Sequence, residues 1–137
     1  MRLSRRALLA SPVVLATPAL AQSFPSRPIR LIVPFAAGGS ADASARMLAD
    51  PMGAALGQPV VVDNRPGAGA TIGAQVVARA APDGLTLLYG TPGPQIINPH
   101  LMRSLPYDPV KDFAPVSGYK RAPNLFAVNA ALPAQDV

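Results

Sequence analysis

The chain contains no cysteine among its 137 residues, and this absence removes several kinds of site. No disulfide and no thiol nucleophile can form, and a zinc site would lack its sulfur ligands. The single histidine, His100, gives too few nitrogen ligands for a metal and only one possible base for a serine triad. No Gly-x-Ser-x-Gly turn presents a serine to it. The sequence therefore predicts no metal, no cofactor and no enzyme.

Charged and aromatic residues are also scarce, at 14% and 5% of the chain. The formal net charge is +5, but three arginines stand in the first six residues, and the rest carries 9 basic and 7 acidic side chains without a run of like charge. A nucleic-acid surface needs clustered basic residues, so no nucleic-acid partner is expected. Lys111 and Lys120 do not follow the glycines of a phosphate-binding P-loop.

The N-terminal segment has the three parts of an export signal. A basic start is followed by the apolar run Ala7–Leu20, and Ala19–Ala21 supplies the small-x-small pattern that signal peptidase reads. The run is about 14 residues long, whereas a membrane-spanning helix needs roughly 20. We expect a signal peptide over residues 1–21, cleavage before Gln22 and a periplasmic location. The pair Arg5–Arg6 fits the twin-arginine route, and the general secretory (Sec) route stays open.

Three short apolar runs rich in β-branched residues predict buried strands: Ile29–Val33, Pro59–Val62 and Leu85–Tyr89. Apolar residues recur at helical spacing after each of the first two runs, between Ala41 and Leu56 and between Ile72 and Ala80. Strands that alternate with helices in this order predict an α/β fold with a parallel sheet and flanking helices.

Single residues refine this prediction. Pro51 is expected to interrupt the first helix, because a mid-helix proline costs about 3 kcal/mol, and Asp50 would then cap a second short helix. Thr71 is expected to be the N-cap of the next helix. After Pro94 the pattern loosens, so the stretch around His100 is interpreted as a loop. Further strands are expected at Phe113–Tyr119 and Leu125–Val128.

Parallel sheets bind ligands at the carboxyl ends of their strands. Those ends are three glycine-rich stretches, at residues 35–42, 63–71 and 90–93. In the first, a glycine pair lets the backbone approach a ligand closely, and the free N–H groups of a helix start suit an anion. An ordinary tight turn is the alternative. Asp42 fits a capping role better than a ligand contact, because its carboxylate would repel an anion.

The stretch Gly67–Gly73 also follows a strand and opens a helix, so it imitates a dinucleotide fingerprint. Its spacing is wrong by one residue, and Leu85–Thr91 contains no acidic residue that could hold a ribose. A dinucleotide cofactor is therefore not expected.

Four blocks of sequence, in order and over essentially the whole mature chain, resemble the receptors of tripartite tricarboxylate transporters, the Bug family. They are Ile-Val-Pro-Phe with Gly38, Gly39 and Asp42; Gly57–Gly69; Ala81–Thr91; and Leu105–Phe113. In the first block, Ala36, Ala37 and Ala41 depart from the prolines and threonine that the family often has there. These departures leave the identity of the substrate open.

The resemblance implies a periplasmic binding protein of the type 2-like class, a two-lobed monomer that closes around a small carboxylate and hands it to a membrane permease. Residues 22–112 would form the first part of ligand-binding domain 1. Residues 113–137 would form the crossover and the start of domain 2, which is incomplete in this chain. The alternatives are a receptor of the same fold that signals to a sensor kinase, and a truncated chain without a function of its own.

Strand ends and resemblance together predict ligand-binding residues on three loops. The resemblance implies that the loops after the first and third strands line the cleft, and the glycine-rich second loop shares their edge of the sheet. The predicted residues are Phe35, Ala36, Gly38, Gly39, Ser40, Asp42, Gly69, Thr71, Gly90 and Thr91.

Overall fold

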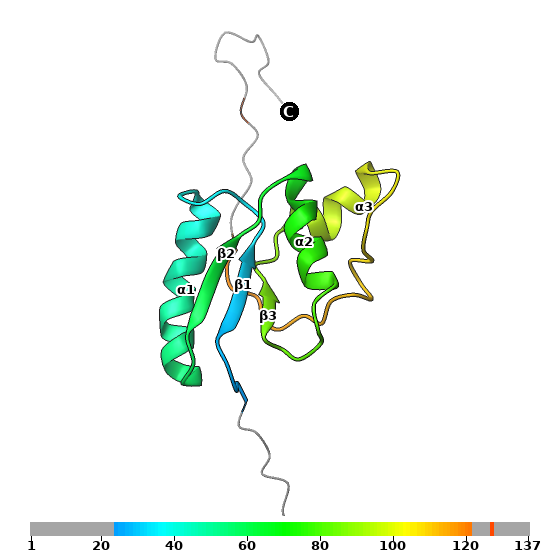
Figure 1. The fold of residues 1–137 in the computed structure, drawn as a ribbon. Helices are drawn as coiled ribbons and strands as arrows, with labels where there is room; N and C mark the ends of the chain where they lie inside the picture. Colours follow the sequence, from blue (N-terminus) through cyan, green and yellow to red (C-terminus); the bar gives the residue numbers. More distant parts are fainter. Residues whose placement is uncertain (1–23, 122–126, 128–137) are drawn as a thin grey trace, which may run out of the picture.

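The computed structural model describes residues 24–121 and residue 127. Three parallel strands, β1 (Ile29–Val33), β2 (Val60–Asn64) and β3 (Thr86–Leu88), form one sheet in the order β2-β1-β3 (Figure 1). The predicted parallel sheet is thereby confirmed. The predicted signal peptide, its cleavage site before Gln22 and most of the predicted strand Leu125–Val128 lie outside the described residues.

The central strand is buried because helices cover the sheet on both sides. Helix α1 (Ser40–Leu56) packs on β1 and β2, and helix α2 (Thr71–Ala78) packs on β1 and β3. Right-handed crossovers in this strand order place the two helices on opposite faces. Four of the five residues of β1 are consequently buried. On the α1 face, Leu31 and Val33 pack with Ala45 to form a small core.

Helix α1 runs through Pro51 without a break, so the predicted interruption there and the predicted cap at Asp50 are wrong. The proline removes one hydrogen bond, to the carbonyl group one turn earlier at Met47. Both residues are exposed, Met47 to 74%, so water can reach that carbonyl group. The helix ends at Gly57, whose φ of 69° closes it in the left-handed conformation.

Helix α2 differs from its prediction at its start and on its buried face. Thr71 is its first residue and Ala70 its N-cap, so the prediction of Thr71 as the N-cap is wrong. The buried residues are Thr71, Gly73 and Ala74, whereas Ile72, expected on the buried face, is 45% exposed. Apolar periodicity missed this face because its closest contact with the sheet is made by a glycine.

The region after β3 contains a helix where a loop was expected. A π-helical segment, η2 (Gly93–Ile97), continues into helix α3 (Asn98–Leu101), and His100 lies exposed within α3. Pro94 and Pro99 obscured it in the sequence, although proline is tolerated in a first helical turn. The stretch Phe113–Tyr119 contains no strand, so that prediction is also wrong.

Candidate functional site

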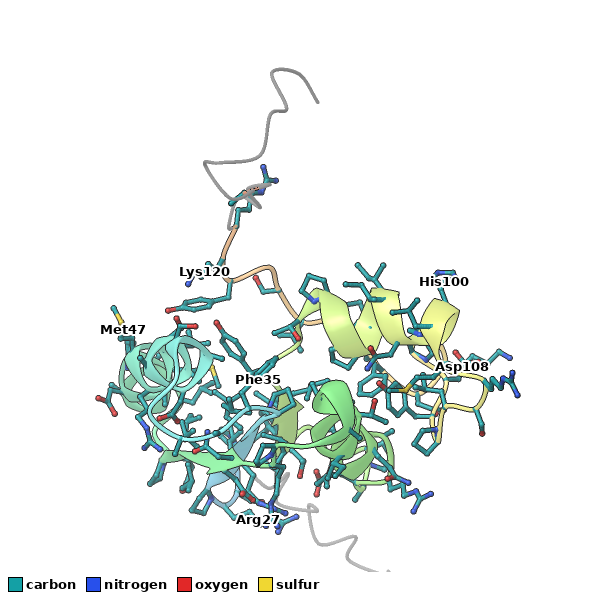
Figure 2. All side chains as sticks on the ribbon, turned by 90° about the horizontal axis from the view of Figure 1, so that it is seen from above. Arg27, Phe35, Met47, His100, Asp108 and Lys120 are labelled. Atoms are coloured by element: carbon teal, nitrogen blue, oxygen red, sulfur yellow. The ribbon has the colours of Figure 1, made fainter. Side chains whose placement is uncertain are left out.

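The carboxyl ends of the three strands meet at one edge of the sheet. An open groove runs from this edge between α1 and β3 to the loop before β3. Figure 2 looks down on this edge, with Phe35 near the centre between α1 and the α3 region. The groove holds about 2120 Å³, more than the roughly 300–1,000 Å³ of a typical ligand pocket. The groove is therefore a one-sided cleft and not an enclosed site.

Seven of the ten predicted ligand-binding residues line this groove. They come from the loop after β1 and the loop after β3: Phe35, Ala36, Gly38, Gly39, Ser40, Gly90 and Thr91. The other three, Asp42, Gly69 and Thr71, are not among its lining residues. The fold thus brings two of the three predicted loops together at the groove and leaves the loop after β2 away from it.

The β1–α1 loop presents bare backbone at the groove. Gly38 has a φ of +83°, a conformation that favours glycine, and Gly39 is the N-cap of α1 without a side-chain cap. The first backbone bond of the helix runs from the N–H of Ala43 to the carbonyl oxygen of Gly39, at 2.9 Å. By helix geometry the N–H groups before Ala43 have no carbonyl partner one turn back. Ser40 and Ala41, which carry two of them, line the groove.

Asp42 turns away from the groove and back towards the loop. It is only 4% exposed, and its Oδ2 accepts the N–H of Gly38 at 2.8 Å and the Nε–H of Arg46 at 3.1 Å. The bond from Arg46, followed by the bond from Gly38, lowers the pKa of the Asp42 carboxyl to about 2. Asp42 is therefore ionised at neutral pH. It is not the N-cap of α1, which is Gly39, but lies in the first turn and reaches back to the N–H of Gly38 in the loop.

Gly69 and Thr71 make structural contacts with a residue that the sequence did not single out. Asn98, 8% exposed, donates through Nδ2 to the carbonyl oxygen of Gly69 at 2.9 Å and to Oγ1 of Thr71 at 3.0 Å. The amide group ties the start of α2 to α3. No local pattern marks this contact, because the partners lie 27 and 29 residues apart.

The β3 side of the groove carries buried polar atoms. Oγ1 of Thr91 and Oε1 of Gln95 are both buried without a hydrogen-bond partner among the described residues. Both residues line the groove, and Gln95 was not predicted.

The segment after α3 crosses the groove towards α1. The ring of Tyr119 packs edge-to-face on Tyr89, with 6.2 Å between centroids, and its hydroxyl group donates to the carbonyl oxygen of Ser44 at 3.3 Å. Nζ of Lys120 lies 3.5 Å from the Ser44 hydroxyl oxygen. Among the described lining residues, Lys120 and Asp112 are the charged ones.

Two further features concern residues 24–121 and residue 127. These residues contain no group of three or more histidine, cysteine or acidic residues placed to hold a metal ion. In the same part of the chain, every helix is too short or too polar to cross a bilayer.

Known proteins resemble this chain in sequence. The model of the family described as tripartite tricarboxylate transporter family receptor matches residues 44–137. A UPF0065 protein of Bordetella bronchiseptica is 46% identical over 135 residues, which cover 96% of this chain and 40% of that protein. Protein BugT of Bordetella pertussis is 44% identical over 119 residues, which cover 86% of this chain and 36% of that protein.

The structural comparison agrees. MatC from Rhodopseudomonas palustris, solved with bound malate, matches with a TM-score of 0.65 and 46% identity, over 68% of this chain and 32% of that chain. The expected fold, part of a periplasmic binding protein, is therefore confirmed. The chain spans about two fifths of the length of the curated relatives that it matches. It belongs to the receptor family of the tripartite tricarboxylate transporters, the Bug proteins, as its four sequence blocks predicted.

Proposed function

We propose that this protein is an extracytoplasmic solute receptor whose β1–α1 loop holds a carboxylate group of a small ligand. The observation that carries the proposal is the start of α1 at the edge of the open groove. Gly39 has no side chain to obstruct a ligand, and Ser40 and Ala41 offer unpaired helical N–H groups there. The positive end of the helix dipole adds to the attraction for an anion.

The rest of the groove suits a ligand with a second polar end. Gly90 and Thr91 lie at the end of β3 beside the β1–α1 loop, and we assign them to the same site. Lys120 adds a positive charge to the lining. Apolar side chains such as Leu87 and Met52 line other parts of the groove. A short dicarboxylate would match two such polar ends, and the relative MatC was solved with malate, a ligand of this class.

The proposal extends to location, domains and partner. The signal over residues 1–21, cleaved before Gln22, would deliver the protein to the periplasm. Residues 22–112 would belong to the first ligand-binding domain, and residues 113–137 would begin the second. The protein would act as a monomer and hand its ligand to a membrane permease, which the family description as a transporter receptor supports.

A thermal-shift screen of the full-length exported protein tests this function. Binding to the native state raises apparent stability, by about 2.7 kcal/mol at a ligand concentration of 100 Kd. We expect malate or another small dicarboxylate to raise the unfolding temperature, and Gly39→Val to abolish most of the rise. If no di- or tricarboxylate has an effect, the receptor proposal fails. Loss of uptake on gene deletion would separate transport from a sensing role.

A further inference from the structure

Two side chains outside the groove hold the β1–α1 loop by its ends. Nδ2 of Asn64, at the end of β2, donates to the carbonyl oxygen of Phe35 at 3.1 Å. Oδ2 of Asp42 accepts the N–H of Gly38 at 2.8 Å. The strand register places Asn64 beside Val33, next to the point where the loop begins. One contact therefore fixes the loop as it leaves β1, and the other fixes it as it enters α1.

Arg46 contacts both of the side chains that hold the loop, Asp42 and Asn64. Its Nε lies 3.1 Å from both carboxylate oxygens of Asp42, and its Nη2 lies 3.4 Å from Oδ1 of Asn64. The Asp42 side chain is buried, whereas that of Arg46 is 56% exposed. The contacts run from Phe35 through these three side chains to Gly38, so they form a closed ring behind the loop.

The loop needs such support because its own residues provide little. Ala36, Ala37, Gly38 and Gly39 have no side chain long enough to anchor the backbone. A Cβ added at Gly38 would meet no atom within 4 Å, so no neighbouring side chain packs closely against it. An unsupported loop of this kind would lose conformational entropy on binding, and a loop ordered in advance avoids that cost.

Arg46 also offsets the negative charge of Asp42, which would otherwise repel an anion at the start of α1. The Asp42 carboxylate lies in the first turn of α1, where by itself it would repel an anionic ligand. The guanidinium group of Arg46 lies in contact with it and carries the opposite charge. The pair is close to neutral for a ligand on the groove side, while the backbone N–H groups keep their attraction.

We infer that Asp42, Arg46 and Asn64 are positioning residues, which hold the β1–α1 loop in its ligand-binding shape and balance the charge beneath it without touching the ligand. The inference rests on the proposed function, because it concerns the same loop. It adds three residues that sequence reasoning did not assign to this role. Two of them, Arg46 and Asn64, were not predicted as site residues.

Two variants of Asn64 in the full-length protein, one isosteric and one truncated, test the inference. Asn64→Asp removes the donor to Phe35 and keeps an acceptor for Arg46, whereas Asn64→Ala removes both contacts. We expect faster amide hydrogen exchange at residues 36–39 in the unliganded variants, and malate affinity weaker by about tenfold, or about 1.4 kcal/mol. Both effects follow from a loop that loses a tether before the ligand arrives.

Asp63→Asn is the matched control. Asp63 precedes Asn64 on β2 and therefore points to the opposite face of the sheet, where it pairs with Arg30 at 2.7 Å and Arg65 at 2.9 Å. Its replacement by asparagine removes the negative charge from both ion pairs and one acceptor oxygen at the same strand end, without touching the loop. Exchange at residues 36–39 and malate affinity should stay at their wild-type values, whatever happens to the unfolding temperature.

The outcomes separate this inference from the proposed function. Unchanged exchange at residues 36–39 in both Asn64 variants overturns the positioning role, even if Gly39→Val abolishes malate binding and the receptor function stands. Faster exchange with wild-type malate affinity overturns it as well, because the Asn64 contact would then order the loop without aiding binding. Whether the loop holds the carboxylate is decided separately by Gly39→Val. If the wild type does not bind malate, the exchange result still decides whether the tethers hold the loop.

Discussion

Replacing Gly73 with alanine tests how closely α2 is seated on the sheet. A Cβ at this position would lie 2.7 Å from Cβ of Pro34 and 2.9 Å from the carbonyl oxygen of Arg65. Both distances are shorter than the contacts that real Cβ atoms make, and neither neighbour is the mobile end of a long side chain. The helix would therefore have to move away from the sheet.

Two opposing terms set the size of the effect. Overpacking costs typically 1–3 kcal/mol, about 2 at its centre. Alanine is better than glycine within a helix by about 0.8–1.0 kcal/mol, which offsets part of that cost. The expected net loss is about 1 kcal/mol, which lowers the unfolding temperature of a 60–100-residue domain by about 4–8 °C. Pro34 directly precedes the β1–α1 loop, so malate affinity should fall as well.

Thermal unfolding and malate calorimetry of the full-length protein measure both effects. Gly90→Ala is the matched control for stability alone, because a Cβ there meets no atom within 4 Å and the backbone has no positive φ, whereas Gly90 itself belongs to the proposed ligand site. Its stability should stay within about 0.5 kcal/mol of the wild type, as for most surface substitutions. A Gly73→Ala variant as stable as the wild type would show that α2 does not approach the sheet as closely as described.

Three further predictions concern the site and its surroundings. Gly39→Val should weaken dicarboxylate binding by at least about tenfold, or about 1.4 kcal/mol, in calorimetry; wild-type affinity in a folded variant would remove the loop from the site. The lowered pKa of Asp42, about 2, means that its contacts with Arg46 and Gly38 stabilise the fold above the unfolded pKa near 4 and are lost as the pH falls towards 2. The difference in unfolding temperature between wild type and Asp42→Asn should therefore be full at neutral pH and shrink between pH 4 and pH 2; a constant difference contradicts the assignment. Asn98→Ala should destabilise the protein by about 1–3 kcal/mol in chemical denaturation, since it removes the donor to the buried hydroxyl oxygen of Thr71; an unchanged midpoint would show that the contact between α2 and α3 adds no stability.

The local pattern of apolar residues was sufficient to predict the sheet. The run Ile29–Val33 predicted the central strand residue for residue, and the strand–helix order predicted parallel pairing. That topology places all three loops at one edge, because parallel strands end together, whereas the choice of the first and third loops as the groove lining came from the family resemblance. The helical segments that sequence reasoning missed are those that contain proline, which usually indicates the end of a helix. Pro51 lies inside a continuous helix, and Pro99 lies in the first turn of α3.

The other features that the sequence did not predict depend on contacts between residues far apart in the chain. The buried face of α2 is centred on Gly73, whose small size matters against Pro34, which is distant in sequence, and against the carbonyl oxygen of Arg65. Asn64 and Arg46 meet although they are 18 residues apart, so no spacing rule marks them as a pair. Thr71 was predicted as a ligand contact, yet its hydroxyl group is occupied by Asn98. Sequence reasoning located the edge of the sheet where the groove begins, but not the contacts of Asn64 with Arg46 and Phe35 beside it.

The contact between Tyr89 and Tyr119 gives the molecule an intrinsic optical signal. The sequence contains no tryptophan and three tyrosines, so tyrosine dominates its near-ultraviolet absorption and emission. Two of the three rings meet edge-to-face, 6.2 Å apart, and both line the groove. A molecule that settles in the groove and separates these rings would change the near-ultraviolet circular dichroism without any added label. Occupancy of the groove could then be followed in real time by stopped-flow spectroscopy on the unmodified chain.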